Sequence, residues 1–112
     1  MKTVTFDVAS LDDVKRRAEA AFRGEAQGAR VSFASPELLF ALMTAKRWEI
    51  VRAMAGAGPM SIREVARRVG RDVKAVHGDV RALLDAGVLH KEGTRVAFPF
   101  DAVHVDVLVS AA

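Results

Sequence analysis

The segment from residue 61 to residue 87 constrains the fold most, because it contains two short amphipathic runs with only a glycine-containing turn between them. Ser61 precedes apolar residues at helical spacing as far as Val69, and Gly70 ends that run. Asp72 begins the second run, which continues to Gly87. The apolar residues of the second run share one face: Val73, Val76, Val80, Leu83 and Leu84. This spacing predicts two amphipathic helices joined by a turn of about three residues.

The residues on either side of this segment extend the pattern. Downstream, residues 88–92 and 96–100 are typical of strands, and Gly93-Thr94-Arg95 between them predicts a tight turn. Upstream, Thr44 is placed to cap a further helix that reaches Ala55. Three helices followed by a hairpin predict a winged helix-turn-helix, in which one helix supports a second helix whose far face fits a nucleic-acid groove about 12 Å wide.

The two ends of the chain lie outside this unit. Residues 3–8 alternate between polar and apolar side chains, residues 10–23 begin with a capping box, and residues 30–34 form a short apolar run. Ser35-Pro36-Glu37 then begins a new helix, and residues 103–109 alternate as a C-terminal strand. The expected fold class is therefore α+β: a winged helix-turn-helix domain over residues 35–112, with an N-terminal β-α-β arm over residues 1–34 and a C-terminal strand.

Composition excludes several classes of protein. The chain has 112 residues and no cysteine, which leaves one domain without disulfides, thiol nucleophiles or cysteine-ligated zinc. No apolar run approaches the ~20 residues of a membrane helix, and no apolar signal region follows Met1, so we expect a cytoplasmic protein without membrane contact. The three histidines lie far apart in the sequence, and no glycine-rich phosphate loop is present. We therefore expect no metal, no cofactor and no enzymatic activity.

The charge of the chain is concentrated locally. The net charge is +3, and residues 61–81 hold six basic and three acidic groups. Opposite the apolar face of the second helix lie two cations among small residues: Lys74, Ala75, Gly78, Arg81 and Ala82. A glycine there costs about 1 kcal/mol of helix stability relative to alanine, which favours close approach to a groove over a tolerated surface glycine. A basic stripe suits phosphate binding, although a solvated helix face has the same composition.

Two further residues have two interpretations each. His77 lies on the flank of the second helix, where it either donates to a phosphate or packs against the supporting helix. Arg95 follows the hairpin turn, where it either enters a minor groove or remains solvated. Phe33, Phe40 and Trp48 suit a small effector pocket, but side chains of this type at such spacings are more often core.

The run from Ser61 to Lys91, with TAKRWEIVRAM before it and RVAFPFDAVHVDVLVSAA after it, resembles the small MarR-like winged-helix transcriptional regulators. More narrowly, it is similar to short prokaryotic regulators encoded as antitoxins of toxin–antitoxin pairs. The resemblance covers residues 35–112 and implies a repressor that binds double-stranded DNA as a homodimer on a palindromic operator. It implies recognition positions at Arg71, Lys74, His77 and Arg81, and phosphate-contacting positions at Ser61 and Arg63. Larger members dimerise through long helices at both ends, and residues 96–112 offer none.

The terminal segments supply a candidate for the dimer interface. Residues 3–8 and 103–109 are expected to pair, to extend the sheet and to help build a dimer, whereas the alternative is a sheet within a monomer. The second functional hypothesis is a winged-helix interaction module that binds and neutralises a partner protein, such as a toxin, through residues 1–34. The expected partner or dimer contacts are Val4, Phe6, Phe22, Val105 and Val107.

Overall fold

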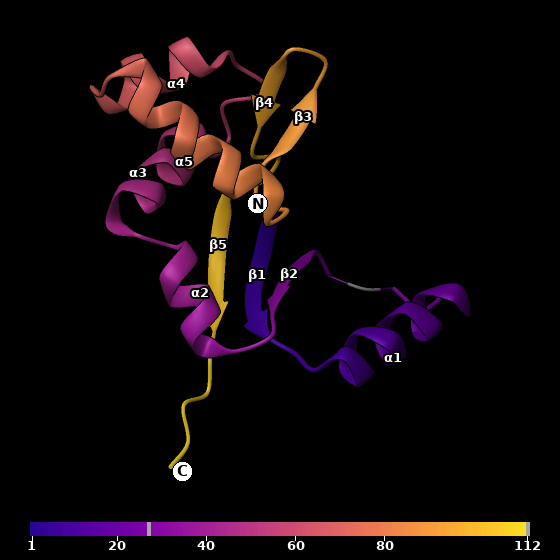
Figure 1. Ribbon diagram of the computed structural model, residues 1–112. Coiled ribbons are helices and arrows are strands. Elements are labelled where there is room, and N and C mark those ends of the chain that lie inside the picture. The colour runs from indigo at the N-terminus through magenta and orange to yellow at the C-terminus, as the bar shows by residue number, and fades with distance from the viewer. Residues whose placement is uncertain (27, 112) are drawn as a thin grey trace.

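Five helices and two β-sheets make up residues 1–26 and 28–111, the part of the chain that the computed structural model describes (Figure 1). In chain order the elements are β1 (Thr3–Val8), α1 (Leu11–Phe22), β2 (Arg30–Phe33), α2 (Pro36–Leu42), α3 (Ala45–Met54), α4 (Ile62–Val69), α5 (Val73–Asp85), β3 (His90–Glu92), β4 (Arg95–Ala97) and β5 (Ala102–Asp106). This mixed α/β order agrees with the elements that the sequence predicts.

Each of the five described helices begins after a residue whose side chain caps it. The cap oxygens accept hydrogen bonds from backbone amides of the first turn and belong to Ser10, Ser35, Thr44, Ser61 and Asp72. At Ser10 the capping box with Asp13 is complete, and Pro36 occupies the first turn of α2. These caps confirm the predicted helix starts.

The larger sheet contains three parallel strands in the order β2-β1-β5. Helix α1 connects β1 to β2, which confirms the predicted β-α-β arrangement. Strand β5 pairs with the other side of β1, and its last pair joins Asp106 to Asp7. Strand β1 ends one residue later, so the predicted strand over residues 103–109 is too long: residues 107–109 lie beyond the last pair.

The hydrophobic core joins this sheet to the helices. Phe6 of β1 stacks on Trp48 of α3 with ring centroids 5.7 Å apart, and it also contacts the ring of Phe33. Phe33 and Trp48 therefore contribute to packing, as their spacing suggested, while Phe40 is 57% exposed. Because β1 and β5 come from the two segments separated at residue 34, one sheet contains strands from both expected parts of the chain.

Two predicted partner contacts require correction. Val4 is 1% exposed and Phe6 is 0% exposed, because the inner face of β1 packs against the chain's own helices. Neither side chain is available to a second molecule. Phe22 and Val105 remain exposed, and Val107 is half-buried against the core.

The smaller sheet is the hairpin of β3 and β4. The strands are antiparallel, with Lys91 opposite Val96, and Gly93 adopts a φ of 63° in the turn between them. Met60, just before α4, forms a bridge with Val96 and holds the hairpin against the helices. Figure 1 shows this hairpin beside α5, at the opposite end of the molecule from the residues that follow β5.

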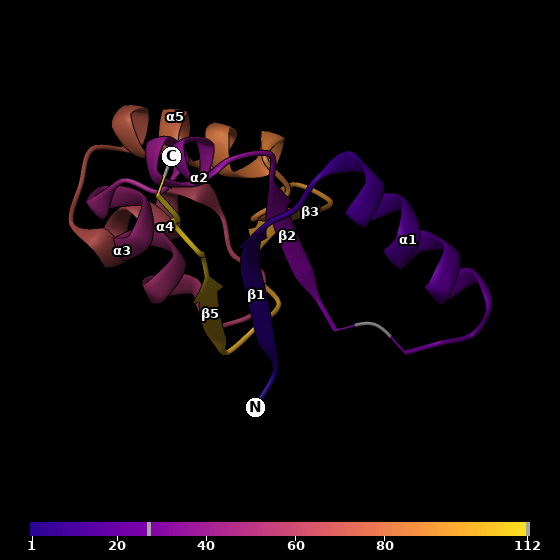
Figure 2. The ribbon, with the colours of Figure 1, turned by 90° about the horizontal axis from the view of Figure 1, so that it is seen from below.

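Helix α1 extends away from the rest of the molecule, as Figures 1 and 2 both show. None of its residues is buried. Arg17 of α1 connects it to the sheet through Asp7, which also accepts hydrogen bonds from Arg30 and Ser32 of β2. The described helices include none that is long and apolar enough to span a membrane.

Candidate nucleic-acid interface

Helices α4 and α5 are held at a fixed angle by a short turn. Gly70 ends α4 in the left-handed conformation, with a φ of 67°, and Asp72 caps α5 two residues later. The facing sides of the helices are apolar and buried: Val65 and Ala66 on α4, and Val76, Val80 and Leu83 on α5. Packing of these faces determines which side of α5 points to solvent.

The outward side of α5 carries the predicted mixture of cations and small residues. Lys74, Ala75, Gly78 and Arg81 are all exposed. A Cβ built on Gly78 meets nothing within 4 Å, so the chain's own packing does not require a glycine there. Thirteen residues of helix span about 20 Å, which suits a groove of DNA. The outward side is therefore open to a large ligand and bears positive charge.

Helix α5 and the hairpin enclose a small hollow of about 100 Å³. Its apolar lining comes from Ile62, Val80, Leu84 and Val96, and its polar lining from His77, Arg81, Lys91 and Thr94. His77 is exposed and lies beside this hollow, at the boundary between α5 and the hairpin. Three basic side chains thus gather between the helix and the hairpin.

Lys91 is a candidate contact that the sequence analysis missed. Directly opposite residues of an antiparallel pair share a face, and Lys91 is opposite Val96, which lines the same hollow. The alternation of side chains on either side of the Gly93-Thr94 turn contains this information. The sequence analysis considered only Arg95, nearest the turn.

The other predicted contacts lie on the same part of the chain. Ser61, Arg63 and Arg95 are exposed, and Ser61 also caps α4 by accepting a hydrogen bond from the amide of Glu64. Within residues 1–26 and 28–111, no ion pair involves Arg63, Lys74 or Arg95. Arg81 lies 3.5 Å from Asp85, but both side chains are about two-thirds exposed, so water weakens this pair.

Arg71 differs from the other predicted recognition residues: it lies in the turn, as expected, but its side chain is directed inward and not to the recognition position that the resemblance implied. Its Nη2 lies 2.9 Å from Asp79 Oδ2, its side chain is only 17% exposed, and its Nη1 is buried without a hydrogen-bond partner among the described residues. The guanidinium is directed to the inner flank of α5 because the shielded carboxylate of Asp79 attracts it. In this structure Arg71 holds the turn against α5.

Asp79 also receives a second guanidinium. Arg47 Nε lies 3.0 Å from Asp79 Oδ1, and Arg47 Nη1 donates to the carbonyl oxygen of Leu42 at 2.9 Å. Burial raises the pKa of Asp79, but the hydrogen bonds from Arg47 and Arg71 outweigh it and bring the pKa below its usual value. The ionised carboxylate therefore connects α5 to α3, to the end of α2 and to the turn.

Two arginines of α4 are partly neutralised. Arg67 and Arg68 both donate to Glu64, and these hydrogen bonds lower the pKa of Glu64 to about 2. Two guanidinium groups share one carboxylate, so this cluster keeps one positive charge. It lies on the exposed side of α4 and adds to the field around α5.

The charge count places the whole excess in this unit. Residues 61–95 contain eight basic and five acidic groups, which gives +3. The remainder of the chain contains nine of each and is neutral. A segment with a net positive charge, beside a neutral remainder of the chain, is the electrostatic arrangement that attracts phosphate.

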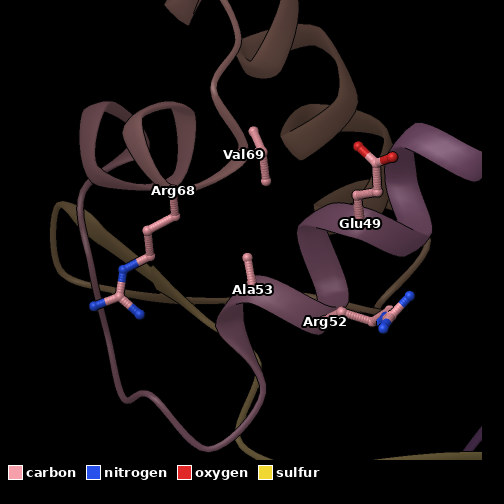
Figure 3. Close-up of a pocket in the computed structure, with 5 residues that line it drawn as sticks. All are labelled: Glu49, Arg52, Ala53, Arg68 and Val69. Atoms are coloured by element: carbon pink, nitrogen blue, oxygen red, sulfur yellow. The ribbon is translucent and has the colours of Figure 1, made fainter.

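The hollow drawn in Figure 3 lies between α3 and the end of α4 and measures about 430 Å³. Ala53 and Val69 lie near its centre, whereas Arg52 and Arg68 point away from each other. A site for a substrate or a metal requires polar groups that converge on a common point. The charged groups of this hollow do not converge in this way. The described residues contain no group of three or more histidine or acidic side chains placed to hold a metal ion.

The fold and the site define a mixed α/β chain in which two helices, a short turn and a hairpin concentrate positive charge. The chain belongs to the family described as HVO_A0114, which matches residues 42–105, more than half of its length. Among solved structures, it is similar to the crystal structure of a predicted DNA-binding transcriptional regulator from E. coli, with 21% identity and a TM-score of 0.46. That similarity covers 78% of this chain and 79% of the other. No curated protein matches the chain.

Proposed function

We propose that this chain is a winged helix-turn-helix regulator that binds double-stranded DNA in a sequence-specific way and represses transcription. One observation carries the proposal: α5 buries Val76, Val80 and Leu83 and leaves its cations and Gly78 exposed beside a basic hairpin. The charge distribution supports the same conclusion, because the net positive charge of the chain lies within residues 61–95 and the rest of the chain is neutral.

In the proposed complex, α5 enters the major groove with its outward face against the base edges. Arg81 and Lys74 donate to purine acceptors, guanine O6 and N7 in particular, and Gly78 allows the helix backbone to approach closely. Ser61 and Arg63 at the start of α4 contact phosphate, which sets the register without reading sequence. Lys91, Arg95 and His77 contact the adjacent backbone or minor groove from the hairpin side.

Arg71 has a positioning role in this proposal. Its bond to Asp79, together with that of Arg47, holds α5 at a defined angle to α3 and to the turn. A recognition helix must be fixed closely before its side chains can discriminate between bases. The network thus supports specificity without contacting DNA.

A salt-titrated binding assay tests the proposal. The purified chain is titrated onto promoter DNA from upstream of its own gene and onto random duplex of equal length. We expect binding about 10³-fold tighter to the promoter, and a loss of that preference in Arg81→Ala. For each tenfold rise in salt concentration, log K is expected to fall by about 0.9 per phosphate neutralised. Equal weak binding to both duplexes contradicts the proposal.

Two finer elements of the proposal come from the resemblance. The regulator is proposed to act as a homodimer on a palindromic operator, and as the antitoxin of a toxin whose operon it autoregulates. The alternative is an interaction module without specific DNA binding, favoured by α1, whose apolar residues Leu11 and Phe22 are 70% and 96% exposed. A tight complex with the neighbouring gene product, combined with equal binding to promoter and random DNA, favours that alternative.

A further inference from the structure

Most of the large apolar side chains that remain exposed lie outside residues 61–95, which contain the proposed DNA-binding surface. They are Leu11, Val14 and Phe22 on α1, Leu38 and Phe40 on α2, and Val105, Leu108 and Val109 at and after β5, with Met1 and Val73 the others among the described residues. Only Val73 belongs to the helix–turn–helix and hairpin unit. Exposed apolar side chains that adjoin a groove are candidates for a protein contact.

One of these surfaces is a groove between α1 and β2. It measures about 460 Å³, and Val14, Ala18 and Ala21 form its α1 wall, with Arg30 and Ser32 on β2. Arg17 lies on the same face of α1 and also lines the groove, where its hydrogen bonds to Asp7 and Ser32 attach the helix to the sheet. Strand β2 is also an edge strand, so one side of its backbone is available to an extended segment.

The charge of the groove indicates what it accepts. Two guanidinium groups, from Arg17 and Arg30, share the single carboxylate of Asp7, which leaves one excess positive charge beside an apolar wall. An extended segment that combines apolar side chains with an acidic one matches this combination, in the manner of peptides that add to a sheet edge.

Residues 105–109 of the same chain, Val-Asp-Val-Leu-Val, have this composition. From Val96 onward the sequence contains no lysine or arginine, and Asp106 supplies the negative charge. Leu108 is 87% exposed and Val109 is 71% exposed, because β1 ends where they would need a partner. Residues 107–109 lie beyond the last pair with β1, and together with the exposed Asp106 they match the groove in polarity and charge.

Topology directs this segment to a second molecule. Strands β5 and β2 lie on opposite sides of β1 (Figure 1), so residues 107–109 leave the sheet at the edge opposite to their own groove. We propose that residues 107–109 of one copy, with the exposed Asp106 directly before them, occupy the α1–β2 groove of a second copy, and that the exchange is reciprocal. Reciprocal exchange uses each contact twice and closes the assembly as a two-fold dimer.

The inference rests on the homodimer included in the proposed function and specifies where that dimer forms. It leaves the outward face of α5 and the hairpin free in both copies. A dimer built from the sheet half of each chain therefore presents two DNA-binding units without covering either of them.

Engineered cysteines test the contact directly, because the natural chain contains none. Ala18→Cys and Leu108→Cys are purified separately, reduced, mixed and oxidised. We expect the mixture to form a disulfide dimer that neither variant forms efficiently alone. As a control, Arg52→Cys, which is exposed on α3, replaces Ala18→Cys in the mixture and is expected not to form this dimer. A yield equal to that of the Arg52→Cys mixture overturns the proposal.

Mass measurement by light scattering gives an independent readout. The wild-type chain is expected at twice 12.1 kDa, and Leu108→Asp is expected to raise the dimer Kd at least tenfold, while Ser110→Asp, which adds the same charge nearby, does not. A wild-type mass that stays at 12.1 kDa overturns the inference, because the groove is then not filled by a second copy of the chain. So does a series of masses that grows beyond the dimer.

The two proposals fail separately. A monomer that binds its promoter specifically overturns the dimer contact and leaves the proposed function intact. A cross-linked dimer that binds promoter and random DNA equally overturns the proposed function and leaves the contact intact.

Discussion

Helices α1 and α5 are nearly equal in length, are both capped, and are both amphipathic, yet they have opposite relations to the core. Helix α5 buries Val76, Val80 and Leu83 and exposes cations, whereas α1 buries nothing and exposes Leu11, Val14 and Phe22. A polar face left open attracts a charged ligand, and an apolar face left open attracts protein. The comparison shows that local sequence makes a helix, while its packing partner determines the surface it offers.

The largest expected effect contrasts two phenylalanines. Phe6 is fully buried between Phe33 and Trp48, and Phe22 is 96% exposed. Phe6→Ala is expected to lower the free energy of unfolding by about 3–5 kcal/mol. Urea denaturation at low protein concentration, where the chain is monomeric, should show almost no change for Phe22→Ala. A similar loss for both variants would mean that α1 packs against the chain's own core.

The second effect concerns the network that fixes α5. Asp79→Asn removes the charge that Arg47 and Arg71 share, and it is expected to cost about 1–3 kcal/mol of unfolding free energy. Asp85→Asn is the matched control on the same helix, because Asp85 is 71% exposed and its loss should cost little. Equal effects of the two substitutions would contradict the positioning role.

The paired carboxyl groups of Asp79 and Asp7 predict a dependence of stability on pH. The pKa values of Asp79 and Asp7 are lowered in the folded chain, so both carboxyls stabilise the fold above their unfolded pKa of about 3.8. That stability is lost as the pH falls through the folded pKa values. Acid unfolding should therefore begin below pH ~4, and Asp79→Asn should reduce the dependence on pH in that range.

The third effect distinguishes a base contact from a phosphate contact within residues 61–95, the segment with the net positive charge. Arg81→Ala is expected to cost about 1–3 kcal/mol on promoter DNA and much less on random DNA. Arg63→Ala should weaken binding to both DNAs about equally and reduce the salt slope by about 1. Titrations of both duplexes at several salt concentrations distinguish these outcomes. Equal losses on the two DNAs for both variants would refute the assignment of α5 to the groove.

The smallest effect is at Gly78. Because a Cβ there meets no other atom of the chain, Gly78→Ala should stabilise α5 by up to about 1 kcal/mol. If the glycine allows close approach to DNA, the same substitution should weaken promoter binding. Thermal unfolding and promoter titration of one sample test both parts. A variant that is more stable and binds equally well would show that Gly78 is only a tolerated surface glycine.

Much of this architecture is encoded locally and could be predicted. The capping side chains of Ser10, Ser61 and Asp72, and the left-handed Gly70, act within a few residues of the helix ends that they define. The apolar face of α5 follows from spacing alone. Such features depend on residues close together in the sequence, so they can be predicted from the sequence alone.

The features that could not be predicted depend on partners distant in sequence. Val4 and Phe6 are buried in the core that β1 shares with the helices, where Phe6 stacks on Trp48 of α3. Strand β5 ends at Asp106 because β1 itself ends at Val8, one residue beyond the last pair. Arg71 matches a recognition position by its place in the turn, yet Asp79, eight residues later, draws it inward. Charge pattern alone does not distinguish an arginine that binds DNA from one that binds a carboxylate.

The most direct test of the central claim, that the outward face of α5 discriminates between DNA sequences, is a competition titration. Labelled promoter duplex is bound by the wild-type chain, by Arg81→Ala and by Phe22→Ala, each against increasing random duplex at one salt concentration. The account predicts a preference of about 10³ for wild type, a collapse of that preference in Arg81→Ala, and its retention in Phe22→Ala at concentrations that maintain the dimer. An unchanged preference in Arg81→Ala, or no preference in the wild type, would contradict it.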